Sequence, residues 1–190
     1  MLGNQFLLLS LSDIGFEGDI PETQPTLEGN ALQKARFIFD RFHIPCFADD
    51  TGLEVKALQG EPGVYSARYA GDLAKYGNEE NRSEANMEKL LDKLLPHTDR
   101  SARFRTVIAY LTPDGEFLFD GTVEGRIALQ KEGEEGFGYD PLFIPEGYDR
   151  SFANMNLHEK NQISHRSRAF IQFVTFLKNP NNTINSKQIR

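Results

Sequence analysis

Three short segments of this 190-residue chain carry the residue types that binding of a nucleoside triphosphate would require. The first is the run Asp-Asp-Thr-Gly at residues 49–52, and the second is Gly-Phe-Gly-Tyr-Asp at residues 136–140. The third is Ser164-His165-Arg166, with Lys160 just ahead of it. Carboxylates suit a metal ion, an aromatic loop suits a planar base, and cations suit phosphates. Each segment is common by itself, so only their combination predicts a nucleotide site.

The acidic pair Asp49 and Asp50 predicts a magnesium site. Neighbouring residues on a strand point to opposite faces, so only one of the two carboxylates can enter a given cleft. Mg²⁺ usually takes one or two carboxylates together with waters and phosphate oxygens. The alternative is an Asx-turn, in which Asp-Thr-Gly only reverses the chain, and these residues alone leave it open.

The loop at residues 136–140 is suited to a base. Gly136 and Gly138 let the backbone approach a ligand closely, Phe137 and Tyr139 offer faces for stacking, and Asp140 can accept a hydrogen bond from a ring N–H. Stacking contributes about 1–3 kcal/mol per base but hardly distinguishes bases, so polar contacts must set the selectivity. The alternative is a plain turn that leads into a strand at the following proline.

The third segment places His165, Arg166 and Arg168 in the first turn of a predicted helix. The helix dipole disfavours cations at this end, and a bound anion would reverse that penalty. The alternative is a solvated basic face, where screening by water and salt makes the unfavourable interaction between these cations and the helix dipole very small.

One mixed α/β domain over residues 1–178, followed by a polar tail over 179–190, is expected to position these segments. In this interpretation Cys46-Phe47-Ala48 is a short strand that ends at the acidic pair, so the carboxylates lie at a strand end. The helices are predicted at 30–42, from a cap at Ser83 to Pro96, and from Ser164 to Asn179. The other strands are predicted at 6–11, 53–55, 102–111, 116–123, 126–129 and 141–144.

Composition excludes several classes of partner. The net charge of −7 and the pI near 5.2 argue against a nucleic acid polymer, because no broad basic surface is available to neutralise phosphates. No apolar stretch reaches the roughly 20 residues that cross a bilayer, so no membrane partner is expected. The lone Cys46 can form no internal disulfide, which predicts a reducing compartment, the cytoplasm.

Four blocks, in this order along the chain, make it resemble the inosine triphosphate pyrophosphatase family, which hydrolyses non-canonical purine nucleoside triphosphates and is also described as XTP/dITP diphosphatase. The blocks are Ala-Asp-Asp-Thr-Gly at 48–52, Pro-Gly-Val-Tyr-Ser-Ala-Arg-Tyr at 62–69, Gly-Phe-Gly-Tyr-Asp-Pro at 136–141, and Glu-Lys at 159–160 through Ser-His-Arg at 164–166. The resemblance covers about residues 7–177.

The resemblance implies a two-lobed mixed α/β fold with a central elongated sheet, a cleft between the lobes, and a homodimer. It also implies Mg²⁺-dependent hydrolysis between the α and β phosphates, which yields a nucleoside monophosphate and pyrophosphate. By position, Asp50 is the expected metal ligand and general base, and Thr51 is a substrate contact. The remaining substrate contacts implied by the resemblance are Phe137, Gly138, Tyr139, Asp140, Lys160, His165 and Arg166.

The chain departs from the family pattern in two places. Family members open with a strand and a Thr/Ser-x-Asn-x-x-Lys loop that contacts phosphates, and nothing before Phe6 matches it, so the chain is expected to start about one strand and one loop late. The family's metal-binding Glu directly precedes an Asn, and here that place is Gly29. Glu28 is therefore the expected second metal ligand.

Two other functions stay open. One is a nucleotide-binding protein with weak or no turnover, because the phosphate loop is absent. The other is a related pyrophosphatase that acts on modified pyrimidine nucleotides, which the motif blocks fit less well.

Overall fold

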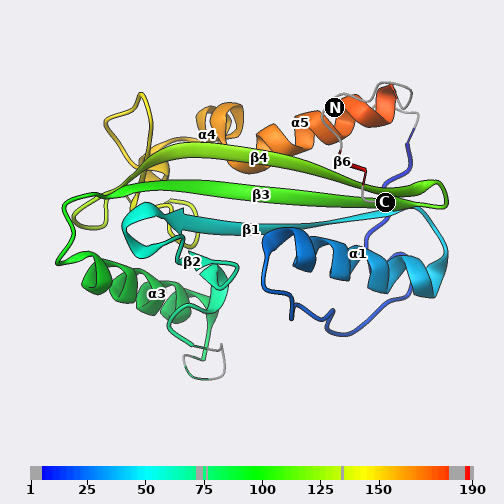
Figure 1. Cartoon of the computed structure of the whole chain (residues 1–190), viewed down its shortest axis with the longest axis horizontal. Coiled ribbons are helices and arrows are strands. Elements are labelled where there is room, and N and C mark those ends of the chain that lie inside the picture. The colour runs from blue at the N-terminus through cyan, green and yellow to red at the C-terminus, as the bar shows by residue number, and fades with distance from the viewer. Residues whose placement is uncertain (1–5, 72–74, 76, 134, 180–186, 189–190) are drawn as a thin grey trace.

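A central antiparallel sheet runs through the whole protein (Figure 1). The computed structural model describes residues 6–71, 75, 77–133, 135–179 and 187–188. The strand order is β2-β1-β3-β4-β5, and β6 pairs with β4. The strands are β1 (Cys46–Val55), β2 (Pro62–Gly63), β3 (Ser101–Thr112), β4 (Gly115–Ile127), β5 (Phe143–Pro145) and β6 (Lys187–Gln188).

Helices lie on both sides of the long strands, with α5 above them and α1 below them in Figure 1. The α-helices are α1 (Leu27–Phe42), α3 (Glu79–Leu94), α4 (Leu157–Ile163) and α5 (His165–Lys178). Within the described part of the chain, three short 3-10 helices lie between the other elements: η2 (Lys56–Leu58), η3 (Ser66–Arg68) and η4 (Phe152–Asn154). No helix among the described residues is both long enough and apolar enough to cross a membrane.

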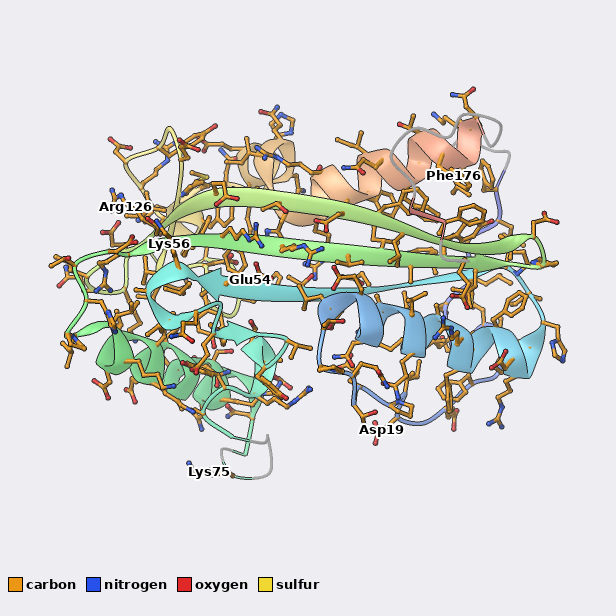
Figure 2. All side chains as sticks on the ribbon, viewed as in Figure 1. Asp19, Glu54, Lys56, Lys75, Arg126 and Phe176 are labelled. Atoms are coloured by element: carbon orange, nitrogen blue, oxygen red, sulfur yellow. The ribbon has the colours of Figure 1, made fainter. Side chains whose placement is uncertain are left out.

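The alternation of side chains along β3 divides the core between the two faces of the sheet. Val107 packs with Ala31 and Ala35 of α1, whereas the next residue, Ile108, packs with Ala169 and Phe173 of α5. A third cluster surrounds Phe104 at the other end of the sheet. Figure 2 shows these two ends, with Phe176 of α5 at one and Arg126 and Lys56 at the other.

Strand β1 forms an edge of the sheet where the acidic pair lies. It pairs with β3 along its whole length, from Cys46 to Val55. In the described part of the chain, β2 pairs with β1 only at Leu53 and Glu54. Residues 46–52 therefore present one side of their backbone outward, and a ligand lying along this edge could reach both faces of the strand.

The acidic pair lies in the middle of a continuous strand, so the prediction of two short strands with the carboxylates at a strand end was wrong. Asp49 and Asp50 pair with Ile108 and Val107, which also excludes the Asx-turn alternative. The physical reason is the partner strand: β3 is long enough to supply hydrogen bonds through the Asp-Thr-Gly run. A local preference for turns is overridden by this pairing.

The predicted strand at residues 6–11 was also wrong, because the segment is irregular and Leu7 is 85% exposed. A separate strand at 126–129 was wrong, because residues 126–127 are the end of the continuous strand β4 and 128–129 lie outside it. The strand predicted at 141–144 lies at 143–145 as β5. The hairpin of β3 and β4 was predicted correctly.

The helix predictions hold with changes at their beginnings. Helix α1 begins at Leu27, because Thr26 caps it through the Gly29 amide, and α5 begins directly after Ser164 as expected. Helix α3 is capped by Asn78 rather than by Ser83, and α4 was not predicted. The division into a domain at 1–178 and a tail stays a prediction, and most of that tail, residues 180–186 and 189–190, lies outside the described residues.

Candidate active site

Strand β1 presents the acidic pair to opposite faces of the sheet, as predicted. Asp50 faces α1, where its carboxylate accepts hydrogen bonds from Asn30 (3.3 Å) and from the ammonium of Lys34 (3.2 Å). Asp49 faces α5, where the guanidinium of Arg166 lies 3.4 Å from its carboxylate. The two carboxylates therefore lie on opposite faces of the sheet and have different partners.

On the face of α1, two acidic and two basic side chains form a largely buried cluster. Lys34 donates to the Glu22 carboxylate at 2.6 Å as well as to Asp50. The side chains of Lys34 and Asp50 are only 14% and 12% exposed. Arg68 of η3 reaches Glu22 from the other side, 3.2 Å from its backbone oxygen and 3.6 Å from its carboxylate. We call these residues, together with Asn30, the Asp50 cluster.

Helix α1 holds this cluster together. Asn30 and Lys34 are one helical turn apart and project side by side toward β1. The fully buried Asn30 also accepts a hydrogen bond from the amide of Gln24 at 2.9 Å, and Thr23 donates its amide to Gln33 at 2.9 Å. These contacts fix the irregular segment before α1 and so place Glu22 beside Lys34.

Burial shapes the protonation of the Asp50 cluster. Burial raises the pKa of the Asp50 carboxyl, and the charge of Lys34 only partly offsets it. Burial alone would lower the pKa of the Lys34 ammonium, but the hydrogen bond to Glu22 and the charge of Asp50 raise it instead. Lys34 therefore stays charged, while Asp50 is a better proton acceptor than a free aspartate.

The carboxylates of Glu22 and Asp50 are the pair that best fits a divalent cation. Both already contact one cation, the ammonium of Lys34, and oxygen ligands of this type suit Mg²⁺. No group of three or more His, Cys, Asp or Glu side chains suited to a metal occurs in the described residues. A metal would share this space with Lys34.

Glu28, the ligand predicted from the sequence, lies elsewhere in a network. Its carboxylate is 2.5 Å from Arg105 of β3, which also pairs with Asp120. A Cβ added at Gly29 would lie 2.7 Å from the Cβ of Gln24, so the close packing here favours glycine over a larger residue. The metal role of Glu28 stays a prediction.

On the face of α5, Arg166 and Thr51 lie together. Arg166 approaches Asp49 and the hydroxyl of Thr51 at 3.4 Å each, and that hydroxyl also hydrogen-bonds to Thr106 at 2.7 Å. Arg166 and Asp49 are 46% and 41% exposed, so water weakens their ion pair. Arg166 can therefore exchange Asp49 for another anion at little cost. Arg168, by contrast, donates to the backbone oxygen of Thr122.

His165 is a buried, neutral base beside this face. Its residue is 4% exposed, and its ring stacks on Phe104 with centroids 4.6 Å apart. Burial, followed by the charges of Arg166 and Lys160, lowers the pKa of His165 to about 3. Its Nδ1 has no hydrogen-bond partner among the described residues. This unused polar atom is available to a ligand.

The loop at 136–140 exposes one aromatic ring. Phe137 is 66% exposed, with the Lys160 ammonium 4.9 Å and the Arg166 guanidinium 5.8 Å from its ring centroid. Tyr139 is 4% exposed and its hydroxyl donates to the backbone oxygen of Ser66 at 3.0 Å. The expectation that Tyr139 offers a stacking face was therefore wrong, because the hydrophobic core takes up its ring.

Asp140 and the glycines fix the shape of this loop. The Asp140 carboxylate is buried and accepts from Lys160 (2.5 Å) and from the Phe137 amide (2.8 Å). Gly136 and Gly138 have φ of 86° and 62°, a region that favours glycine, and a Cβ on Gly136 would lie 2.4 Å from the Asp140 carboxylate. Whether Asp140 also accepts from a base stays a prediction.

The three segments that together predict a nucleotide site meet only in part. The loop at 136–140 and the start of α5 do meet around Phe137. Asp50, however, lies on the opposite face of β1 from Arg166, so the strand itself separates the two. The two halves adjoin only along the edge of β1 described above. This arrangement suits an elongated ligand that passes around the edge.

Four residues of the Asp50 cluster were not predicted: Glu22, Asn30, Lys34 and Arg68. A signal for two of them exists, because Asn30 and Lys34 are polar residues at helical spacing beside an apolar stripe. Glu22 lies in an irregular segment and Arg68 in a short turn. No periodic pattern marks either.

Comparisons with known proteins identify the family of the chain. The model of the Ham1 family matches residues 1–176. The chain is 49% identical over 179 residues to the dITP/XTP pyrophosphatase of Flavobacterium psychrophilum, covering 94% of this chain and 90% of that protein. It is 53% identical to the dITP/XTP pyrophosphatase of Porphyromonas gingivalis, covering 90% and 84%. The structure of the Staphylococcus aureus Ham1 protein matches with a TM-score of 0.86 at 42% identity, covering 94% and 90%.

Proposed function

The chain belongs to the Ham1 family, and from that premise we propose that it hydrolyses non-canonical purine nucleoside triphosphates, such as ITP, dITP and XTP, to the nucleoside monophosphate and pyrophosphate. The observation that supports this most is the edge of β1. It has a carboxylate and cation cluster on one face, and a basic site with an exposed aromatic ring on the other. A metal-bound triphosphate would suit the first face, and a planar base would suit the second.

A magnesium ion is held in this proposal by the carboxylates of Glu22 and Asp50. Bound there, it would neutralise charge on the phosphates and polarise their oxygens. Lys34 lies against both carboxylates and Arg68 against that of Glu22, and the two cations bind the phosphate oxygens beside the ion. The cations therefore exchange one set of anionic partners for another when substrate enters.

Asp50 acts as the general base for the attacking water. A bond forms between the water oxygen and the α-phosphorus, the bond from that phosphorus to the α–β bridging oxygen breaks, and the Asp50 carboxylate takes the water's proton. Burial makes the carboxylate more basic than usual, which favours this transfer. Pyrophosphate leaves with the bridging oxygen.

The base lies against Phe137 in this proposal, with Lys160, His165 and Arg166 around it. Inosine and xanthine carry a 6-oxo group that accepts hydrogen bonds, where adenine has an amino group that donates. A pocket lined by donors leaves groups unpaired when adenine enters, and such mismatches discriminate by about 10⁴-fold. Thr51, next to Arg166, contacts the sugar or phosphates. Gly138, Tyr139 and Asp140 keep the loop in shape.

Two further properties follow from the family premise and the composition. We propose a homodimer, as the family resemblance implies, and a location in the cytoplasm, as the lone Cys46 suggests. The matched relatives are named as pyrophosphatases, which favours an active hydrolase over a nucleotide-binding protein with weak turnover. Their names also favour purine over modified pyrimidine substrates.

The test is incubation of the protein with ITP, dITP, XTP and ATP plus Mg²⁺, followed by measurement of pyrophosphate. We expect rapid release from the first three and slow release from ATP. Equal rates with ATP, or release of orthophosphate alone, would contradict the proposal.

A further inference from the structure

The turn η3 is held by a buried side chain from a different part of the chain. Asn86 of α3 is 4% exposed, and its amide donates to the backbone oxygens of Ser66 (3.3 Å) and Ala67 (3.1 Å). Its side-chain oxygen accepts from the amide of Ala70 at 2.7 Å. One side chain thus bonds to two backbone oxygens within the turn and to a backbone amide two residues beyond it.

The same turn is tied to the sheet and to the aromatic loop. The Ser66 hydroxyl accepts from the Leu53 amide (2.9 Å) and donates to the Gly63 oxygen (2.6 Å). The Ser66 backbone oxygen accepts from both Asn86 and the hydroxyl of Tyr139. This single carbonyl is therefore shared by α3 and by the loop that carries Phe137.

The turn ends in Arg68, whose guanidinium contacts Glu22 in the Asp50 cluster. The side of the site assigned to phosphates and the side assigned to the base are thus joined through Ser66. Buried hydrogen bonds of this kind are costly to leave unmade, so they hold the turn in one position. Within the described part of the chain, the hydrogen bonds of the Asn86 side chain go to backbone groups of Ser66, Ala67 and Ala70 and to no residue proposed to bind substrate.

We propose that Asn86 is a positioning residue for substrate binding: it fixes the turn Ser66–Arg68 so that Arg68 meets the phosphates. This inference rests on the proposed function. Asn86 acts through Arg68, so its loss weakens binding of substrate and leaves the chemical step at Asp50 nearly unchanged. A merely structural role would lower stability without this selective effect.

The test is a double-mutant cycle of Asn86→Ala with Arg68→Ala. Affinity is measured by calorimetry with Mg²⁺ and an ITP analogue that carries nitrogen in place of the α–β bridging oxygen. We expect Asn86→Ala to weaken binding about tenfold, as for the loss of one to two buried hydrogen bonds, and to change kcat for ITP less than about twofold. On the Arg68→Ala background the same change should weaken binding less than about twofold.

Leu94→Ala is the matched control, because Leu94 is fully buried in the same helix and makes no hydrogen bond to the turn through its side chain. It should lower Tm with affinity nearly unchanged. A full tenfold loss from Asn86→Ala in the absence of Arg68, or an equal affinity loss in Leu94→Ala, would overturn the inference. Should Asn86→Ala fail to fold, Asn86→Ser leaves a smaller cavity but cannot reach all three backbone groups, and it enters the same cycle with an expected loss of about threefold.

The cycle measures affinity, so it decides the role of Asn86 even when the wild-type protein releases no pyrophosphate. That last result would refute the proposed reaction, whereas additivity in the cycle would refute only the positioning role.

Discussion

Replacing Lys34 by methionine should make the protein depend on magnesium for its stability. The change keeps the length of the side chain but removes the ammonium that lies 2.6 Å from Glu22 and 3.2 Å from Asp50. Breaking a buried ion pair by removing one partner costs about 3–5 kcal/mol. Glu22 is 37% exposed, so water relieves part of this and a loss of about 2–3 kcal/mol is expected here. For a chain of this length that lowers Tm by about 4–12 °C.

Magnesium should restore much of this loss, because an ion between Glu22 and Asp50 supplies the missing positive charge. The assay is thermal unfolding of wild type and Lys34→Met at several Mg²⁺ concentrations without nucleotide. Stabilisation by Mg²⁺ should be larger in Lys34→Met than in the wild type. The additional gain should disappear in the double variant with Asp50→Asn, because one of the two carboxylates is then neutral.

A matched control is Lys131→Met, which breaks the ion pair with Glu84 at the surface, where the two side chains are 46% and 44% exposed. It should cost less than about 1 kcal/mol and show no change in its response to Mg²⁺. Equal stabilisation of wild type and Lys34→Met by Mg²⁺ would refute the reasoning, and so would an unchanged Tm in Lys34→Met.

Three further outcomes are expected. Asp50→Asn should abolish turnover while the free energy of unfolding at pH 7 stays the same or rises. The raised pKa of Asp50 means that the folded state favours the protonated carboxyl, and the stability that protonation contributes is lost as pH rises through the folded-state pKa. Asparagine resembles the protonated carboxyl, so the stability gained by Asp50→Asn at pH 7 should vanish in strong acid. A loss of stability at pH 7 or near-normal turnover would count against this assignment. Arg166→Ala should raise KM for ITP about tenfold or more, as for one charge-assisted hydrogen bond, and an unchanged KM would remove Arg166 from the anion site. Gly121→Ala should lower kcat/KM at least tenfold with normal secondary structure by circular dichroism. Its Cβ would lie 2.1 Å from the backbone oxygen of His165 and would push the start of α5 away from β4. Wild-type kinetics in this variant would show that the close packing of α5 on β4 is not needed for activity.

Gly121 affects both the packing of α5 on β4 and the position of residues proposed to bind substrate. The start of α5 carries His165 and Arg166, and it can lie against β4 only because position 121 lacks a side chain. Nothing in the sequence around Gly121 distinguishes this glycine from one in an ordinary bend. The close approach of two backbones is a property of the folded state.

The local sequence was sufficient to predict several structural features and to suggest the chemistry of three segments. Polar and aromatic types at 49–52, 136–140 and 164–166 suggest metal, base and phosphate contacts, and Ser164 marks the start of α5, because capping depends on residues a few positions apart. The hairpin of β3 and β4 was likewise predictable, since alternating strands flank a short turn. The opposite orientation of Asp49 and Asp50 also follows from strand geometry alone.

The tertiary structure decided which groups share a space. Pairing with β3 turned an apparent turn at Asp50 into the middle of a strand, and packing of α1 brought Glu22, Asn30 and Lys34 to its carboxylate. The same packing placed Glu28 in an ion pair with Arg105, and the ring of Tyr139 is buried in the core. Residue types and spacing report what a segment can bind, whereas partners distant in sequence depend on long-range contacts that no local pattern encodes.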